Sequence, residues 1–100
     1  MRAILLAAFC LFALPAFAED VTIDNFTFTP AEITVKAGAT VTWTNRDDIP
    51  HTVTSAAHPP IFRSPALDTN ETTSVTFNTP GVYRYFCSLH AHMQGTVIVQ

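Results

Sequence analysis

Charged side chains are scarce in this sequence. Only 13% of its 100 residues are charged, whereas 48% are hydrophobic, and the formal net charge is −3. The high hydrophobic content excludes a disordered tail, and the lack of excess basic residues excludes a basic binder of nucleic acid. The length also leaves no room for a multidomain enzyme. The composition therefore indicates one small, neutral to acidic globular domain.

Long hydrophobic runs are also few, and the main one lies at the N-terminus. Residues 3–14 carry no charge and follow the basic Arg2, and Ala16-Phe17-Ala18 has the small-x-small pattern of a cleavage site. The run is shorter than the roughly 20 apolar residues that span a membrane. We therefore predict a signal peptide over residues 1–18, with no stable membrane anchor. Residues 19–100 would form the mature domain, exported to the periplasm.

Cysteine and methionine each occur only twice. Cleavage after Ala18 would leave Cys87 and Met93 as the single representatives of their types. No disulfide could then form within the exported domain, although its compartment permits disulfides. An unpaired thiol in such a place is buried and inert, joined to another chain, or bound to a ligand.

Hydrophobic and polar residues alternate through most of residues 19–100, as expected of half-buried strands. We find no convincing helix, and turn signals such as Ala37-Gly38 separate the runs. This pattern predicts an all-β sandwich, with residues 55–70 as a loop that crosses between the sheets. The expected strands cover residues 20–28, 32–36, 39–45, 51–54, 72–77, 82–87 and 95–99.

Several other side chains have a predicted place in this sandwich. Tyr83 lies at the start of an expected strand, where it forms either a tyrosine corner, with its hydroxyl bonded back to the backbone, or part of the core. Trp43, Phe26 and Phe28 are expected in the core. Solvated turns are the expected place of the acidic residues Asp47, Asp48, Asp68 and Glu71.

Three possible metal ligands occur within a short segment. Cys87, His90 and Met93 have the spacing C-x-x-H-x-x-M directly after an apolar strand. His51 opens another expected strand, and it would complete a set of four if the two strand ends are neighbours. The remaining histidines of the mature domain, His58 and His92, are expected at the surface.

Two imidazoles, one thiolate and a weak thioether suit copper better than zinc. The set is soft enough for Cu(I) and still accepts Cu(II) in nearly the same arrangement. A structural zinc site more often uses four strong ligands, and a thioether is a poor ligand for zinc. The same set is typical of blue-copper electron-transfer sites. A rigid site of this kind changes little between oxidation states, which favours fast electron transfer.

Six motifs spread over the mature domain carry a family resemblance. They are Phe26-x-Phe28-x-Pro30, Ile33 to Gly38, Val41 to Asn45, Pro50-His51-Thr52-Val53, Gly81-x-Tyr83-x-Tyr85-x-Cys87 and Met93-x-Gly95-x-Val97. With these motifs the chain resembles cupredoxins of the amicyanin and plastocyanin type, and amicyanin-like proteins most closely. One departure lies in the ligand loop, which carries Ala91-His92 where amicyanins have a proline and an aromatic residue.

The resemblance implies a Greek-key β-sandwich that holds one type 1 copper ion. His51, Cys87 and His90 would be the equatorial ligands and Met93 the axial ligand. The backbone amide of Thr52 would donate to the Cys87 sulfur, and electrons would pass through the edge of His90 in an apolar surface patch. The implied redox partners are a quinoprotein amine dehydrogenase as electron donor and a c-type cytochrome as acceptor.

Three functions remain open at this point. The leading hypothesis is a monomeric periplasmic electron carrier that is not an enzyme, since nothing supplies an open coordination position or a second centre. The alternative is a periplasmic copper-binding protein for copper trafficking or cuproprotein maturation, although such proteins tend to offer several methionines or histidines. A thiol enzyme in which His51 or His90 activates Cys87 would lack an identifiable orienting group.

Overall fold

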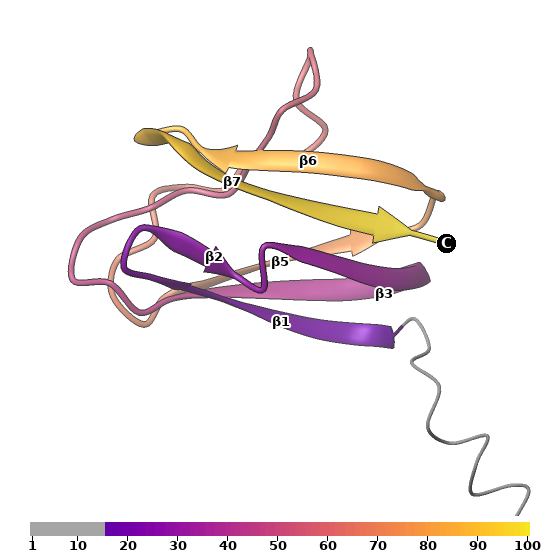
Figure 1. Ribbon diagram of the computed structural model, residues 1–100, viewed down its shortest axis with the longest axis horizontal. Coiled ribbons are helices and arrows are strands. Elements are labelled where there is room, and N and C mark those ends of the chain that lie inside the picture. Colours follow the sequence, from indigo (N-terminus) through magenta and orange to yellow (C-terminus); the bar gives the residue numbers. More distant parts are fainter. Residues whose placement is uncertain (1–15) are drawn as a thin grey trace, which may run out of the picture.

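The fold of the described residues, 16–100, consists of β-strands joined by turns and loops. It is seen in a computed structural model of the chain (Figure 1). No helix occurs in this range, which agrees with the predicted all-β class. The strands are β1 (Ala16–Asp24), β2 (Thr27–Thr29), β3 (Glu32–Asn45), β4 (Thr54–Ser55), β5 (Thr72–Phe77), β6 (Gly81–Cys87) and β7 (His90–Val99).

The strands form two layers that face each other (Figure 1). In one layer β6 pairs antiparallel with both β7 and the short β4. In the other layer β3 pairs antiparallel with β5 and parallel with β1, which in turn pairs with β2. The predicted Greek-key sandwich is thereby confirmed.

β3 belongs to both layers, because it changes partners at Gly38. Residues Glu32–Val35 pair parallel with β7, whereas residues Ala39–Thr44 pair antiparallel with β5. Gly38 has a φ of 95°, which a residue with a side chain rarely adopts. The break predicted at Ala37-Gly38 is therefore present as a bend inside one strand.

The core lies between the layers and follows the alternation of the strands. In β3 the side chains of Val41, Trp43 and Asn45 are buried, and the threonines between them are half-buried. Tyr85 from the opposite layer packs on Trp43 with ring centroids 5.2 Å apart and ring planes 80° apart. Phe28 meets the same tyrosine at 4.7 Å. The expectation that Trp43 and Phe28 are core residues is confirmed.

The structure corrects the predicted strand at residues 20–28. It ends at Asp24, and a two-residue turn of Asn25 and Phe26 leads into β2, with Asp24 paired to Thr27. Both turn residues have positive φ, 51° and 58°. Phe26 is consequently lifted out of the core and is exposed, so its predicted core position is wrong.

Tyr83 forms the tyrosine corner rather than a plain core contact. Its hydroxyl donates a hydrogen bond of 2.6 Å to the carbonyl oxygen of Thr79, four residues earlier. This bond ties the loop between β5 and β6 to the start of β6. Of the two interpretations of the sequence, the first is therefore confirmed.

The described range includes the last three residues of the predicted signal peptide. Residues 1–15 of that segment lie outside the described residues, and Ala16–Ala18 begin β1. Glu19 to Ile23 pair with Val41 to Asn45 of β3. Cleavage after Ala18 would leave these pairs intact.

Within residues 16–100, there is no helix with the length and hydropathy needed to cross a membrane.

Candidate metal centre

The turn between β6 and β7 places two of the predicted ligands. Cys87 is the last residue of β6 and His90 is the first of β7, and the two are paired across the hairpin. Cys87 follows Tyr85 by two residues and shares its inward face of β6, so the Cys87 side chain lies in the core. His90 is only half-buried. The hairpin thus presents a buried sulfur and a partly exposed imidazole at one end of the sandwich.

His51 reaches the same end from the segment between β3 and β4. Its backbone amide donates a hydrogen bond of 3.2 Å to the carbonyl oxygen of Leu67, and its carbonyl oxygen accepts one of 2.7 Å from the Leu67 amide. The buried amide of Asn45 supports this segment, because its Nδ2 donates to the carbonyl oxygens of Ile49 and Leu67. The His51 side chain is fully buried.

The ligand atoms of His51, Cys87 and His90 all lie within 4.8 Å of one another. The Cys87 Sγ lies 3.6 Å from Nδ1 of His51 and 3.7 Å from Nδ1 of His90. Both imidazoles therefore turn the same nitrogen toward the sulfur. Two imidazole nitrogens and one thiol sulfur at this separation fit a metal ion placed between them, and this donor set suits copper.

Met93, the fourth predicted ligand, is buried on β7. It shares the inward face of that strand with Val97 and Val99. A thioether on this face, three residues beyond His90, is the donor expected to complete the set. His58 and His92, by contrast, are exposed, as predicted.

The Cys87 sulfur accepts a hydrogen bond from the backbone amide of Thr52, with an N to S distance of 3.4 Å. The expectation drawn from the resemblance is thereby confirmed. The Thr52 hydroxyl also accepts a 2.8 Å hydrogen bond from the amide of Ser88, the residue after the cysteine. It lies 2.8 Å from the Ser88 hydroxyl as well. Thr52 therefore fixes both the Cys87 sulfur and the backbone of Ser88.

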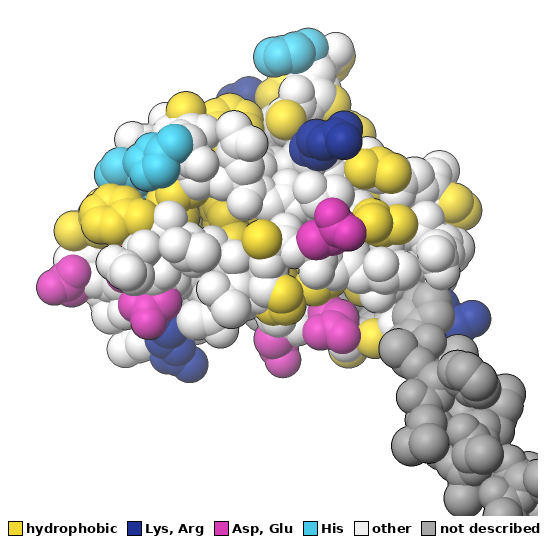
Figure 2. Space-filling model, viewed as in Figure 1, with side chains coloured by type: hydrophobic (Ala, Val, Ile, Leu, Met, Phe, Trp, Pro, Cys, Tyr) yellow, Lys and Arg dark blue, Asp and Glu magenta, His cyan; other side chains and the backbone are white. Residues whose placement is uncertain are grey.

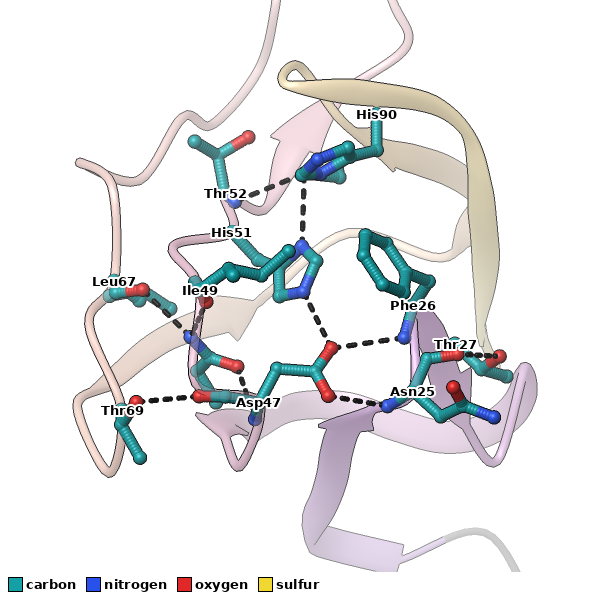
Figure 3. Close-up of polar contacts among 12 residues, drawn as sticks. Asn25, Phe26, Thr27, Asp47, Ile49, His51, Thr52, Leu67, Thr69 and His90 are labelled. Carbon is teal, nitrogen blue, oxygen red and sulfur yellow. Dashed lines mark hydrogen bonds and ion pairs between the residues drawn. The ribbon is translucent and has the colours of Figure 1, made fainter.

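Asp47 was expected in a solvated turn, but the structure places its carboxylate at Nε2 of His51, the ring nitrogen that does not face the Cys87 sulfur (Figure 3). Its Oδ2 lies 2.7 Å from Nε2 of His51, and its oxygens accept hydrogen bonds from the amides of Asn25 and Phe26. Burial works to raise the pKa of this carboxyl. The hydrogen bonds from Phe26, Asn25 and His51 outweigh burial, so the pKa is lower than that of an ordinary aspartate.

Phe26 is the second contributor that the sequence did not reveal. Its ring lies at nearly right angles to both histidines, with ring centroids 5.5 Å from His51 and 5.1 Å from His90. Figure 3 shows it beside both imidazoles. Asp47 and Phe26 are 21 residues apart in sequence, and no local pattern links either of them to the cysteine loop.

Hydrophobic side chains gather around histidines at this end of the molecule (left in Figure 2). Leu89, in the turn between Cys87 and His90, is 52% exposed. The exposed part of Phe26 lies beside His90 as well. The half-buried imidazole of His90 therefore reaches the surface next to apolar groups, as the resemblance implies.

Comparisons with known proteins agree with this geometry. The Cupredoxin-like domain family matches residues 2–99. Amicyanin-alpha of Methylorubrum extorquens is 41% identical over 86% of this chain and 75% of its own length. Amicyanin of Paracoccus versutus is 37% identical over 87% of this chain and 68% of its own.

Solved structures give the same result. The crystal structure of amicyanin from Paracoccus versutus has a TM-score of 0.78 and 36% identity, covering 87% of this chain and 85% of that one. A purple cupredoxin from Nitrosopumilus maritimus has a TM-score of 0.76 and 33% identity, covering 82% of this chain and 99% of that one. The chain therefore belongs to the cupredoxin-like family, and its relatives include the amicyanins.

Proposed function

We propose that this protein is an exported electron carrier, not an enzyme, that binds one type 1 copper ion through His51, Cys87, His90 and Met93. The observation that carries the proposal is the convergence of two Nδ1 atoms on the Cys87 sulfur, within 3.7 Å. Membership of the cupredoxin-like family supports it. When bound, the copper ion would supply a reversible one-electron change.

The protein's part is to hold the ligands in nearly one arrangement. The amide of Thr52 donates a hydrogen bond to the Cys87 sulfur and helps to fix its position. The Asp47 contact at Nε2 leaves Nδ1 of His51 free for the metal. Ligands fixed in this way reorganise little when the electron arrives or leaves.

His90 is the proposed route for the electron. It is the only one of the three clustered residues that reaches the surface, and it lies among the apolar side chains of Phe26 and Leu89. We propose a quinoprotein amine dehydrogenase as donor and a c-type cytochrome as acceptor, by analogy with the amicyanins among the relatives. Stopped-flow reduction and oxidation with purified partners of each class would test this assignment.

Export to the periplasm forms part of the proposal, with residues 1–18 as the signal peptide and residues 19–100 as the cupredoxin domain. The uncharged run of residues 3–14 and the motif Ala16-Phe17-Ala18 support it. Expression of the full chain in a bacterial host, followed by fractionation and intact mass measurement, provides the test. A periplasmic protein beginning at Glu19 is expected, and a cytoplasmic protein that retains Arg2 would contradict the proposal.

A copper titration tests the ligand set. The mature domain should develop an intense blue absorption band with one equivalent of Cu(II) and should give a reversible one-electron wave. Cys87→Ser and His90→Ala should lose the band, whereas the matched control His92→Ala should keep it because His92 is exposed. A colourless wild type, or an equal effect of the two histidine variants, would contradict the proposed site.

Copper release distinguishes the carrier from the alternative of copper trafficking. A carrier should retain its ion when challenged with a Cu(I) chelator, because its ligands are buried and held by the scaffold. Rapid and complete transfer to the chelator, without a reversible wave, would favour trafficking or cuproprotein maturation.

A further inference from the structure

Phe26, in the turn between β1 and β2, has a backbone conformation that a bulky residue rarely adopts. Asn25 and Phe26 both have left-handed φ values, 51° and 58°. Two-residue hairpin turns with this geometry prefer glycine at the second position, and a bulky residue there is strained. The strain needs an explanation, because such outliers persist only where the surrounding structure holds them in place.

A single carboxylate holds this turn. The Asp47 oxygens accept hydrogen bonds from the amide of Asn25 at 2.6 Å and from the amide of Phe26 at 3.0 Å. The same carboxylate contacts Nε2 of His51 at 2.7 Å. The turn and the histidine are therefore fixed relative to each other through one side chain (Figure 3).

The ring of Phe26 uses this placement to contact both histidines. Its plane stands at 86° to the His51 ring and at 90° to the His90 ring, with centroids close enough for edge-to-face packing. The two imidazoles are themselves 5.1 Å apart. Although 42% of Phe26 remains exposed, its ring packs edge to face against both imidazoles.

We propose that Phe26 is a positioning residue for the metal centre: it fixes the tilt of His51 and His90 and excludes water from them. The inference rests on the proposed function in that these histidines bind copper. Its effect on the centre follows from charge. A dry surrounding disfavours the more highly charged Cu(II) form, so Phe26 should raise the reduction potential.

Two glycine substitutions in the same turn separate this role from a structural one. Phe26→Gly removes the ring and relieves the strained φ, while its amide can still donate to Asp47. Asn25→Gly makes the same backbone change one residue earlier and leaves the ring in place. Since glycine is favoured at both positions, neither variant should unfold. Phe26→Tyr, which keeps the ring, serves as the rescue.

The first measurement uses the metal-free protein. Phe26→Gly should shift the ring proton resonances of His51 and His90 in the NMR spectrum, and Asn25→Gly should leave them unchanged. Unchanged resonances in Phe26→Gly would overturn the ring placement. This result does not depend on copper, so it stands even if the proposed function fails.

The second measurement uses the copper form. Phe26→Gly should lower the reduction potential and slow electron self-exchange severalfold, and Phe26→Tyr should restore both. A potential and a rate equal to those of Asn25→Gly would overturn the positioning role, even with a normal blue band. Loss of the band in the wild type would instead contradict the proposed function.

Discussion

Nε2 of His51 lies 2.7 Å from Oδ2 of Asp47, and Nδ1 of the same ring lies 3.6 Å from the Cys87 sulfur. The two nitrogens of one imidazole therefore have separate tasks. The outer nitrogen is held by a carboxylate, which fixes the orientation of the ring. The inner nitrogen is left for the metal.

Asp47→Ala is expected to destabilise the metal-free domain by about 1 to 3 kcal/mol, because Nε2 of the buried His51 ring loses its partner. The exposed amides of Asn25 and Phe26 lose the same acceptor. Urea unfolding measures the change. Asp48→Ala is the matched control, since that neighbouring aspartate is exposed, and it should stay within about 0.5 kcal/mol of wild type. Equal effects of the two variants would contradict a structural role for the Asp47 carboxylate.

Thr52→Val keeps the amide that donates to the Cys87 sulfur and removes the hydroxyl that holds Ser88. We expect a loss of about 0.5 to 1.5 kcal/mol in unfolding free energy, because the Ser88 amide loses its acceptor in the protein. Release of copper to a chelator should also become faster, since the backbone beside the sulfur is no longer fixed.

Thr42→Val provides the comparison for that variant. Its hydroxyl pairs with Ser74 on the exposed face, 2.8 Å away. Loss of this surface pair should change stability by no more than about 0.5 kcal/mol and leave copper release unaltered. A larger effect at Thr42 than at Thr52 would show that the hydroxyl beside the cysteine has no special importance.

Gly95→Ala is expected to be destabilising for steric reasons. Gly95 pairs with Tyr85 across β6 and β7, and a Cβ at this position would overlap the end of the Tyr85 ring. Because Tyr85 is wedged against Trp43 and Phe28, the ring has little room to move. A cost of about 1 to 3 kcal/mol follows, measured by thermal or urea unfolding. Gln94→Ala, at an exposed neighbour, should cost much less.

The stability of the domain should fall between pH 10 and 12. Burial raises the pKa of the Tyr85 hydroxyl from 10.0 to about 12. In this interval the unfolded chain has lost the tyrosine proton and the folded chain still holds it, so rising pH favours unfolding. The contribution lost is about 3 kcal/mol in total. Unfolding titrations should show the decline in wild type and a smaller one in Tyr85→Phe. Identical curves would contradict the assignment.

The strands could be predicted because each sandwich strand buries one face, which leaves a period of two in the sequence. The alternation around Val75 and Phe77 defined β5 at the observed bounds, 72–77. The same rule failed near Phe26, since its hydrophobicity is that of a core residue and only the turn geometry moves it outward. At Gly38 the turn signal was real, but the chain continues as strand on both sides.

The candidate site also has residues that could be predicted from the sequence and residues that could not. Cys87 and His90 could be found from their spacing, because they belong to one hairpin. His51 could be named from the sequence only on the condition that two strand ends are neighbours, since its place beside the hairpin depends on a long-range pairing with Leu67. Asp47 and Phe26 left no signal. Their roles arise from contacts between the β1–β2 turn and the segment after β3, which only the assembled fold brings together.

The change of partners within β3 links the two layers covalently as well as by pairing. Residues Glu32–Val35 are bonded to β7, and the following half of the strand is bonded to β1 and β5. The two layers therefore cannot separate without disrupting the pairing of β3. His51 follows β3 in the chain while Cys87 and His90 flank the β6–β7 turn, so the three should separate only when the whole domain opens. Metal loss by partial unfolding should accordingly be rare, and unfolding should be a single cooperative transition.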